Sequence, residues 1–340
     1  MNKMDKKFTI AFDINGNDNG IFAAVSASYS FAKQNPNFKI ILVGPEKEIL
    51  ETKVAGFVKK PENIEIINNN LISLNPENIR GSLHEPTSMN IAIDLVKDKK
   101  AHAVLSSGNS GLYLAANTFK LKRLPNTSRA AFMPIMPTIF GNKWLLLDVG
   151  ANIETRSEYL VEWAIIANVF AKIMLKIENP RVSLINIGTE DNKGIETIRS
   201  AHQILKSTKD LNYIGFVEPR EALNSICDVG VIDGYGGNLV LKSLEGAILS
   251  FKELLKNKIS KSLVRKIGYL LAKNAFKDVA ETLDYRNVGA AWVIGVDGVA
   301  IKSHGGSDQK AYIGALNQIK LGLENDVLNK FKLALNEKNE

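Results

Sequence analysis

Short apolar runs recur along the chain, and most are followed by a stretch with the spacing of an amphipathic helix. Such runs predict buried strands, and their alternation with helices indicates a mostly parallel sheet covered on both faces. We therefore expect a three-layer α/β fold. The expected strands are 8–14, 39–44, 64–69, 101–108, 130–137, 143–150, 181–188, 211–218, 229–234 and 290–302. The expected helices are 20–34, 87–99, 109–122, 157–176, 193–207, 237–257, 308–323 and a final amphipathic helix that frays within 324–340.

Composition narrows the class of protein. Of 340 residues, 45% are hydrophobic and 23% are charged, which is typical of a globular chain. We expect a single catalytic domain over 1–340, with two lobes that share a cleft. The single cysteine, Cys227, excludes an internal disulfide and fits a reducing cytoplasm. The apolar run before Asp13 is too short for a secretory leader, and no run reaches the ~20 apolar residues that span a bilayer. We therefore expect a cytoplasmic protein.

Positive charge is concentrated in one segment. The net charge is +7, and residues 249–277 alone carry eight Lys or Arg and one acid. The rest is close to neutral, which argues against a nucleic-acid surface. Apolar residues recur every four positions between the cations, which predicts a basic amphipathic helical segment. It could contact a membrane, an acidic protein or a second subunit through Leu255, Ile259, Leu263, Arg265, Lys266, Ile267 and Leu271.

Small and polar residues follow several strands, at the sheet edge where open α/β folds bind ligands. The turn 106–111 (SSGNSG) precedes a helix, and a helix N-terminus favours anions. The turn 301–308 (IKSHGGSD) adds a lysine and a histidine in front of another helix. The first turn could instead be an ordinary connection capped by Asn109 or Ser110. The candidate phosphate ligands in the two turns are Ser107, Gly108, Asn109, Ser110, Gly111, Lys302, His304, Gly305 and Ser307.

Three further turns carry candidate chemistry. Asp148 and Asn152 lie in 146–152 (LLDVGAN), and Lys193 lies in 186–194 (NIGTEDNKG), where it could neutralise an oxyanion. Each could equally be a structural turn or, for the lysine, solvated surface. The turn 233–238 (DGYGGN) does not match a dinucleotide fingerprint. It offers Asp233, Gly236, Gly237 and an amide donor, Asn238.

Other classes of chemistry lack their motifs. No Cys/His pair has metal-ligand spacing, so no metal is expected. A phosphate-binding loop for ATP and a G-x-S-x-G serine elbow are also missing. We expect no cofactor and no covalent serine intermediate. The remaining histidines, His84, His102 and His202, are isolated in the sequence and are interpreted as structural.

In order, these motifs resemble the PlsX family of phosphate acyltransferases over residues 8–320. The segments that carry the resemblance are 13–18, 87–96, 106–111, 146–152, 180–194, 215–221, 228–246 and 297–311. Asp13, in the opening DINGND, also follows the family pattern. The chain departs from that pattern at Asn15, Asn17, Pro86, Thr189 and Pro219.

The resemblance implies a fold like that of phosphotransacetylases and isocitrate-dehydrogenase-type enzymes, with a protruding helical pair, and a homodimer. It implies transfer of a fatty acyl group from acyl-carrier protein to inorganic phosphate. The acyl phosphate would feed a glycerol-3-phosphate acyltransferase in phospholipid synthesis, beside an anionic membrane surface. Lys193, Asp233, Asn238 and His304 are then the candidate catalytic residues. Two alternatives remain: a phosphotransacetylase or phosphobutyryltransferase that uses acyl-CoA, and a non-catalytic scaffold that binds acyl carrier at a membrane.

Overall fold

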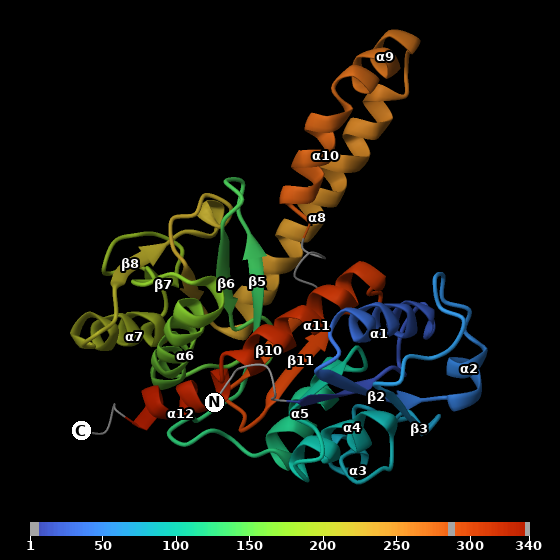
Figure 1. Cartoon of the computed structure of the whole chain (residues 1–340). Helices are drawn as coiled ribbons and strands as arrows, with labels where there is room; N and C mark the ends of the chain where they lie inside the picture. The colour runs from blue at the N-terminus through green and yellow to red at the C-terminus, as the bar shows by residue number, and fades with distance from the viewer. Residues whose placement is uncertain (1–6, 285–289, 337–340) are drawn as a thin grey trace.

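The computed structural model describes residues 7–284 and 290–336, and its centre is one sheet of eleven strands (Figure 1). The strand order is β3-β2-β1-β4-β11-β10-β5-β6-β9-β7-β8. The bounds are β1 (Phe8–Asp13), β2 (Phe38–Gly44), β3 (Ile64–Asn68), β4 (Ala103–Ser106), β5 (Ala131–Pro137), β6 (Lys143–Leu147), β7 (Val182–Ile185), β8 (Tyr213–Val217), β9 (Val229–Val231), β10 (Ala290–Ile294) and β11 (Val299–Ser303).

Helices connect most of the strands. They are α1 (Phe22–Gln34), α2 (Glu46–Glu51), α3 (Ile79–Ser82), α4 (Ser88–Lys97), α5 (Ser110–Lys120), α6 (Ser157–Phe170), α7 (Glu196–Ser207), α8 (Gly234–Ile259), α9 (Leu263–Leu271), α10 (Lys273–Thr282), α11 (Gln309–Glu324) and α12 (Val327–Asn336). The short helices α2 and α3 were not expected. The π-helix η1 (Ala171–Leu175) completes the segment expected at 157–176, and a 3₁₀ turn, η2 (Pro219–Glu221), follows β8.

The sheet consists of two parallel halves joined by antiparallel central strands. β1, β2, β3, β4 and β11 pair in parallel on one side, and β6, β9, β7 and β8 do so on the other. Between them, β10 runs antiparallel to β11 and β5, and β5 runs antiparallel to β6. The expected fold class is confirmed. The single strand expected at 290–302 is wrong, because the chain reverses after Gly295 and forms two strands, β10 and β11.

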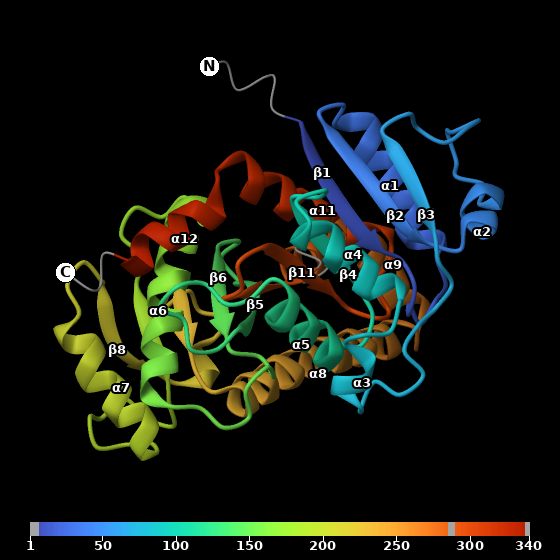
Figure 2. The ribbon, with the colours of Figure 1, turned by 90° about the horizontal axis from the view of Figure 1, so that it is seen from below.

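Helices bury both faces of the sheet. One large core packs α1, α6, α11 and α12 against one face. The other face is covered by α4 and α5 in one half, which lie in front in Figure 2, and by α8 in the other. Apolar residues point to both faces of the strands, which explains the continuous apolar runs in the sequence.

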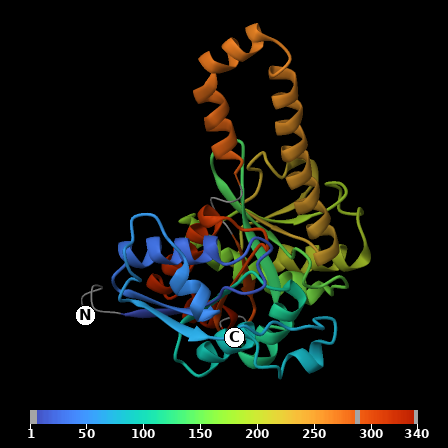
Figure 3. The same cartoon turned by 90° about the vertical axis from the view of Figure 1, so that its right-hand side faces the viewer.

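A helical pair extends away from the sheet (Figures 1 and 3). It consists of the distal part of α8, followed by α9 at the tip and α10 on the way back. The four-residue apolar spacing does not follow one continuous helix, because α8 ends at Ile259 and Ser262 caps a new helix at Leu263. Within the ranges 7–284 and 290–336, none of the helices combines the length and apolar character needed to cross a bilayer.

Candidate active site

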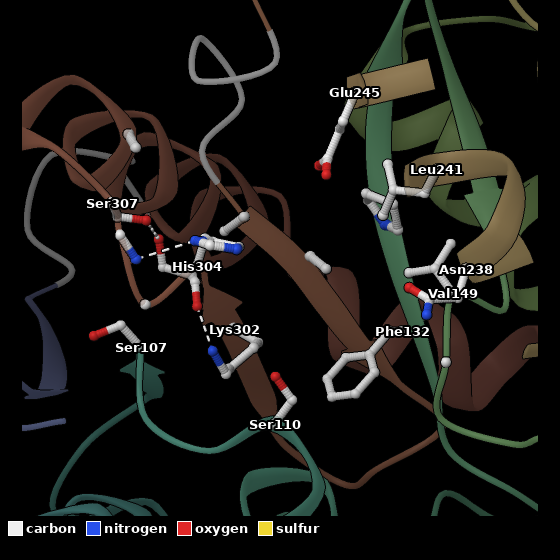
Figure 4. A pocket seen from close by; sticks show the side chains of 18 of the residues that line it. Ser107, Ser110, Phe132, Val149, Asn238, Leu241, Glu245, Lys302, His304 and Ser307 are labelled. Atoms are coloured by element: carbon white, nitrogen blue, oxygen red, sulfur yellow. Dashed lines mark hydrogen bonds between the residues drawn. The ribbon is translucent and has the colours of Figure 1, made fainter. Parts of the chain in front are cut away.

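A cavity of about 830 Å³ lies between the two halves of the molecule (Figure 4). Four of the turns singled out from the sequence meet there: the β4–α5 turn, the β11–α11 turn, the turn after β6 and the first turns of α8. The predicted site residues that line the cavity are Ser107, Gly108, Asn109, Ser110, Asn238, Lys302, His304, Gly305 and Ser307. The β4–α5 and β11–α11 turns lie side by side because β4 and β11 are parallel neighbours whose carboxyl ends coincide.

The β4–α5 turn is shaped by two short side chains. Asn109 Oδ1 accepts the Leu112 N–H at 2.9 Å and caps α5, as the alternative interpretation of this turn expects. Ser106 Oγ accepts the Gly108 N–H at 3.1 Å and donates to the Asp13 carboxylate at 2.7 Å. These contacts direct the α5 N-terminus, with its partial positive charge, towards the cavity.

The β11–α11 turn brings a histidine to the same cavity. His304 Nδ1 accepts the Gly306 N–H at 3.0 Å, so the neutral ring carries its proton on Nε2. Ser307 Oγ lies 2.7 Å from Ser303 Oγ, and Asp308 caps α11 by accepting the Ala311 N–H at 2.9 Å. A side chain at Gly305 would collide with the Asp18 carboxylate, 2.7 Å from the position of its Cβ. The Ser307 N–H donates to the His304 carbonyl at 3.1 Å, so the Gly306 and Ser307 N–H groups are both used within the turn, and the turn offers the cavity an imidazole N–H.

A buried lysine lies next to these turns. Burial lowers the pKa of Lys302 to about 8, although the carboxylates of Asp13 and Asp18 act in the opposite direction. Its side chain donates to the Ser303 carbonyl. Burial raises the pKa of Asp13 to about 6. Asp13 does not line the cavity; it lies underneath and holds Ser106.

On the other side of the cavity, Asp148 anchors the start of α8. Its carboxylate accepts the Phe132 N–H at 3.0 Å and the Asn152 N–H at 2.7 Å, and burial raises its pKa to about 6. Asn152 also donates to the Ala130 carbonyl at 2.8 Å. Gly237 packs directly on the Asp148 backbone. Asp148, Asn152 and Gly237 support the cavity wall and do not line it.

Helix α8 begins with Asp233, whose carboxylate accepts the Gly236 N–H at 2.7 Å. Neither Asp233 nor Gly236 lines the cavity, and a role for either in the reaction stays a prediction. The residues of α8 that do line it are three or four positions apart, which places them on one face of the helix. They are Asn238, Leu241, Lys242 and Glu245.

Comparison with known sequences decides the family. Residues 8–330 match the profile of a family described as "Fatty acid synthesis protein". The chain belongs to this family. A phosphate acyltransferase of Mycoplasmopsis agalactiae is 62% identical over 331 residues, which are 97% of this chain and 99% of that protein. One of Mycoplasma mobile is 53% identical over 95% of this chain and 98% of its own length. The resemblance to the PlsX family is confirmed, and the chain is an acyltransferase.

Solved structures agree with this fold. A phosphotransacetylase from Streptococcus pyogenes superposes with a TM-score of 0.60 at 16% identity, over 94% of this chain and 95% of that one. A branched-chain phosphotransacylase from Enterococcus faecalis V583 gives 0.56 at 12% identity, over 93% and 99%. At these identities the likeness establishes the fold alone.

One family motif lies away from the cavity of this acyltransferase. Lys193 is in the loop between β7 and α7, where Asn186 Nδ2 donates to its carbonyl at 3.1 Å. Its side chain does not line the cavity, so the structure does not bring this fifth turn together with the other four. Gly111 also lies outside the lining. A role for Lys193 in the reaction stays a prediction.

Sequence reasoning missed the apolar part of the cavity wall. Phe132, Pro134 and Met136 come from alternate positions of β5, and Val149 and Leu241 complete this side. The period-two pattern of β5 and the helical spacing from Asn238 to Glu245 were the signals that could have found them. Among the described residues, no group of three or more His, Cys, Asp or Glu side chains is placed to hold a metal ion.

Proposed function

We propose that this acyltransferase moves a long-chain fatty acyl group from acyl-carrier protein to inorganic phosphate. The observation that carries the proposal is one cavity with two chemically different sides. Two turns at helix N-termini, with Lys302 and His304, form one side. Apolar side chains of β5, with Val149 and Leu241, form the other, next to the polar residues Asn238, Lys242 and Glu245 of α8. A phosphate and a fatty acyl thioester need these two environments next to each other.

Phosphate is best placed between the N-termini of α5 and α11. Both helices are capped at their first turn, and their free N–H groups favour an anion. The Lys302 ammonium adds a positive charge, and His304 Nε2 adds a directional donor. With this geometry, binding would orient one phosphate oxygen towards the thioester and would remove much of the entropic cost of bringing two reactants together.

In the proposed reaction, an oxygen of HPO₄²⁻ attacks the thioester carbonyl carbon, and a C–O bond forms. The carbonyl oxygen becomes an oxyanion, and the Asn238 amide is the candidate donor that stabilises it. The C–S bond then breaks, the carbonyl re-forms, and the proton of the phosphate passes to the departing sulfur, while His304 Nε2–H donates to a phosphate oxygen. The products are an acyl phosphate and a free thiol, so atoms and charge balance without a cofactor.

A thiol-release assay tests this function. Long-chain acyl-carrier protein should release free thiol only when phosphate is present, and acyl phosphate should form in equal amount. Asn238→Ala should lower kcat by about 10²–10³, the usual effect of losing one oxyanion donor. Asn329→Ala, an exposed asparagine that hydrogen-bonds to Asp326, is the matched control and should retain full activity.

The same assay separates the thiol donors. Acyl-CoA of the same chain length is offered in place of acyl-carrier protein. A higher kcat/KM with acyl-CoA would show that the coenzyme thioester is the preferred acyl donor. Thiol release that does not depend on phosphate would contradict the function itself.

We also propose a peripheral membrane and subunit contact for the helical pair, with the product passed on to glycerol-3-phosphate acylation. Supporting this, Leu263, Ile267 and Leu271 of α9 are 77%, 60% and 84% exposed and lie among cations. Exposed apolar residues with basic neighbours favour an anionic lipid surface. Phe251 and Leu254 on α8 are exposed as well and offer a surface for a second copy of the chain.

A further inference from the structure

Three polar side chains meet underneath the anion-binding side of the cavity. Asn17, from the loop after β1, hydrogen-bonds to Ser107 in the β4–α5 turn and to the Tyr312 hydroxyl on α11. The Tyr312 hydroxyl also lies 3.0 Å from Ser107 Oγ. Of the three, Ser107 lines the cavity, as Figure 4 shows. The sequence assigned no role to Asn17 or Tyr312.

The orientation of the Asn17 amide follows from its other contact. Its Nδ2 donates to the Ile14 carbonyl at 2.7 Å, and a carbonyl oxygen can only accept. The Oδ1 atom must therefore face the two hydroxyl groups and accept from them. An acceptor that is left without a donor in this site would be costly.

The number of hydroxyl protons in this cluster limits which hydrogen bonds can form at the same time. Ser107 and Tyr312 have one hydroxyl proton each, and Asn17 Oδ1 needs at least one of them. While Tyr312 donates to Asn17, Ser107 is free to turn its proton towards an anion in the cavity. Without the tyrosine hydroxyl, the serine proton would be retained by Asn17, and an anion would meet the lone pairs of Ser107 instead.

We infer that Tyr312 and Asn17 are positioning residues that release the Ser107 hydroxyl to bind phosphate. The inference rests on the proposed function, because it requires phosphate at this end of the cavity. The tyrosine is suited to a constant donor role. It is completely buried, it packs on Phe12 with ring centroids 5.3 Å apart, and burial raises its pKa to about 12.

Tyr312→Phe removes the hydroxyl and keeps the ring. We expect KM for phosphate to rise by roughly tenfold to a hundredfold, the usual value of a hydrogen bond to a charged group, while kcat changes much less. Ser107→Ala should give a rise of the same size. The double variant should be no worse than Ser107→Ala alone, because the tyrosine acts through the serine.

Tyr113→Phe is the matched control. Its hydroxyl is also buried. It donates to the carbonyls of Val104 on β4 and Ile301 on β11, at 3.1 and 3.0 Å. It should lower stability without changing KM for phosphate. A Tyr312→Phe enzyme with unchanged KM, or a double variant whose effects add, would overturn the inference. Failure of the proposed function would appear in the unmodified protein, as a lack of phosphate-dependent thiol release. Failure of the inference would appear only in the variants, so the two can be distinguished.

Discussion

At the scale of single residues, three buried groups with shifted pKa values lie around the cavity. Asp13 and Asp148 are buried carboxyls whose pKa values burial raises to about 6. Both accept hydrogen bonds that hold a turn of the cavity wall in place. Lys302 is the buried cation between the two anion-binding turns, and its protonation decides whether that side of the cavity carries a positive charge.

The pKa of Lys302 predicts a pH dependence of phosphate binding. Since it is lowered to about 8, we expect KM for phosphate to rise as the pH increases through this value and the ammonium loses its proton. Arginine keeps its charge in this range, so Lys302→Arg should move the rise to higher pH. Steady-state kinetics between pH 6 and about 9.5 would check it. The same alkaline limb in both proteins would show that another group is responsible.

The same pKa has a consequence for stability, and its sign can be worked out. Lys302 titrates at its ordinary 10.5 in the unfolded chain and at about 8 in the folded one. Between these values the unfolded chain binds more protons. The contribution of this lysine to the free energy of unfolding therefore rises with pH across that window.

At the scale of elements, α8 connects the cavity with the helical pair. Its first turn packs on the carboxyl end of β6, where Gly237 lies so close that an added Cβ would be 1.9 Å from the Asp148 carbonyl oxygen. Further along the helix, the face bearing Leu241 and Glu245 still lines the cavity. Beyond that face the helix leaves the sheet, and a Cβ added at Gly246 would meet nothing within 4 Å outside the backbone of its own helix.

These two glycines of one helix give a matched prediction. Gly237→Ala should lower the free energy of unfolding by about 1–3 kcal/mol and reduce turnover, because the helix must move away from Asp148. Gly246→Ala should raise stability by about 0.5–1 kcal/mol, since alanine is the better helix former. Urea denaturation and thiol release measure both effects. Equal behaviour of the two variants would contradict the close packing at Gly237.

At the scale of the whole molecule, the cavity lies between two helix-covered half-sheets. The helical pair extends beyond both halves (Figure 3). The tip helix α9 buries none of its residues. Its exposed apolar side chains lie among cations, and this combination favours the proposed contact with an anionic lipid surface.

Vesicle flotation tests the membrane contact at this scale. The unmodified protein should float with anionic vesicles, and Leu263→Glu should lose most of that binding, because it removes apolar contact and adds a negative charge. Leu333→Glu on α12, where the leucine is 62% exposed, is the control and should still float. Undiminished flotation of Leu263→Glu would leave the subunit interface as the better assignment for α9.

The sequence by itself determined most elements and the chemistry of the turns. Strands that are buried on both faces are apolar throughout, and capping residues mark where helices begin. Strands and helix starts can therefore be predicted from short stretches of sequence. The turns at Asn109, Asn238 and His304 were found in this way. Parallel strands predict that these turns lie at one edge of the sheet, but they do not predict how the turns are arranged around the cavity.

Tertiary structure alone decided how distant segments meet. The reversal after Gly295 depends on how β10 pairs with β5, and periodicity does not record pairing direction. Lys193 has the local features of the other site turns, but its loop follows β7, which lies next to the edge strand β8. Asn17 and Tyr312 are 295 positions apart, and neither has a local pattern that indicates the other. Local sequence encodes burial and backbone preference, whereas proximity across the sheet depends on the order of its strands.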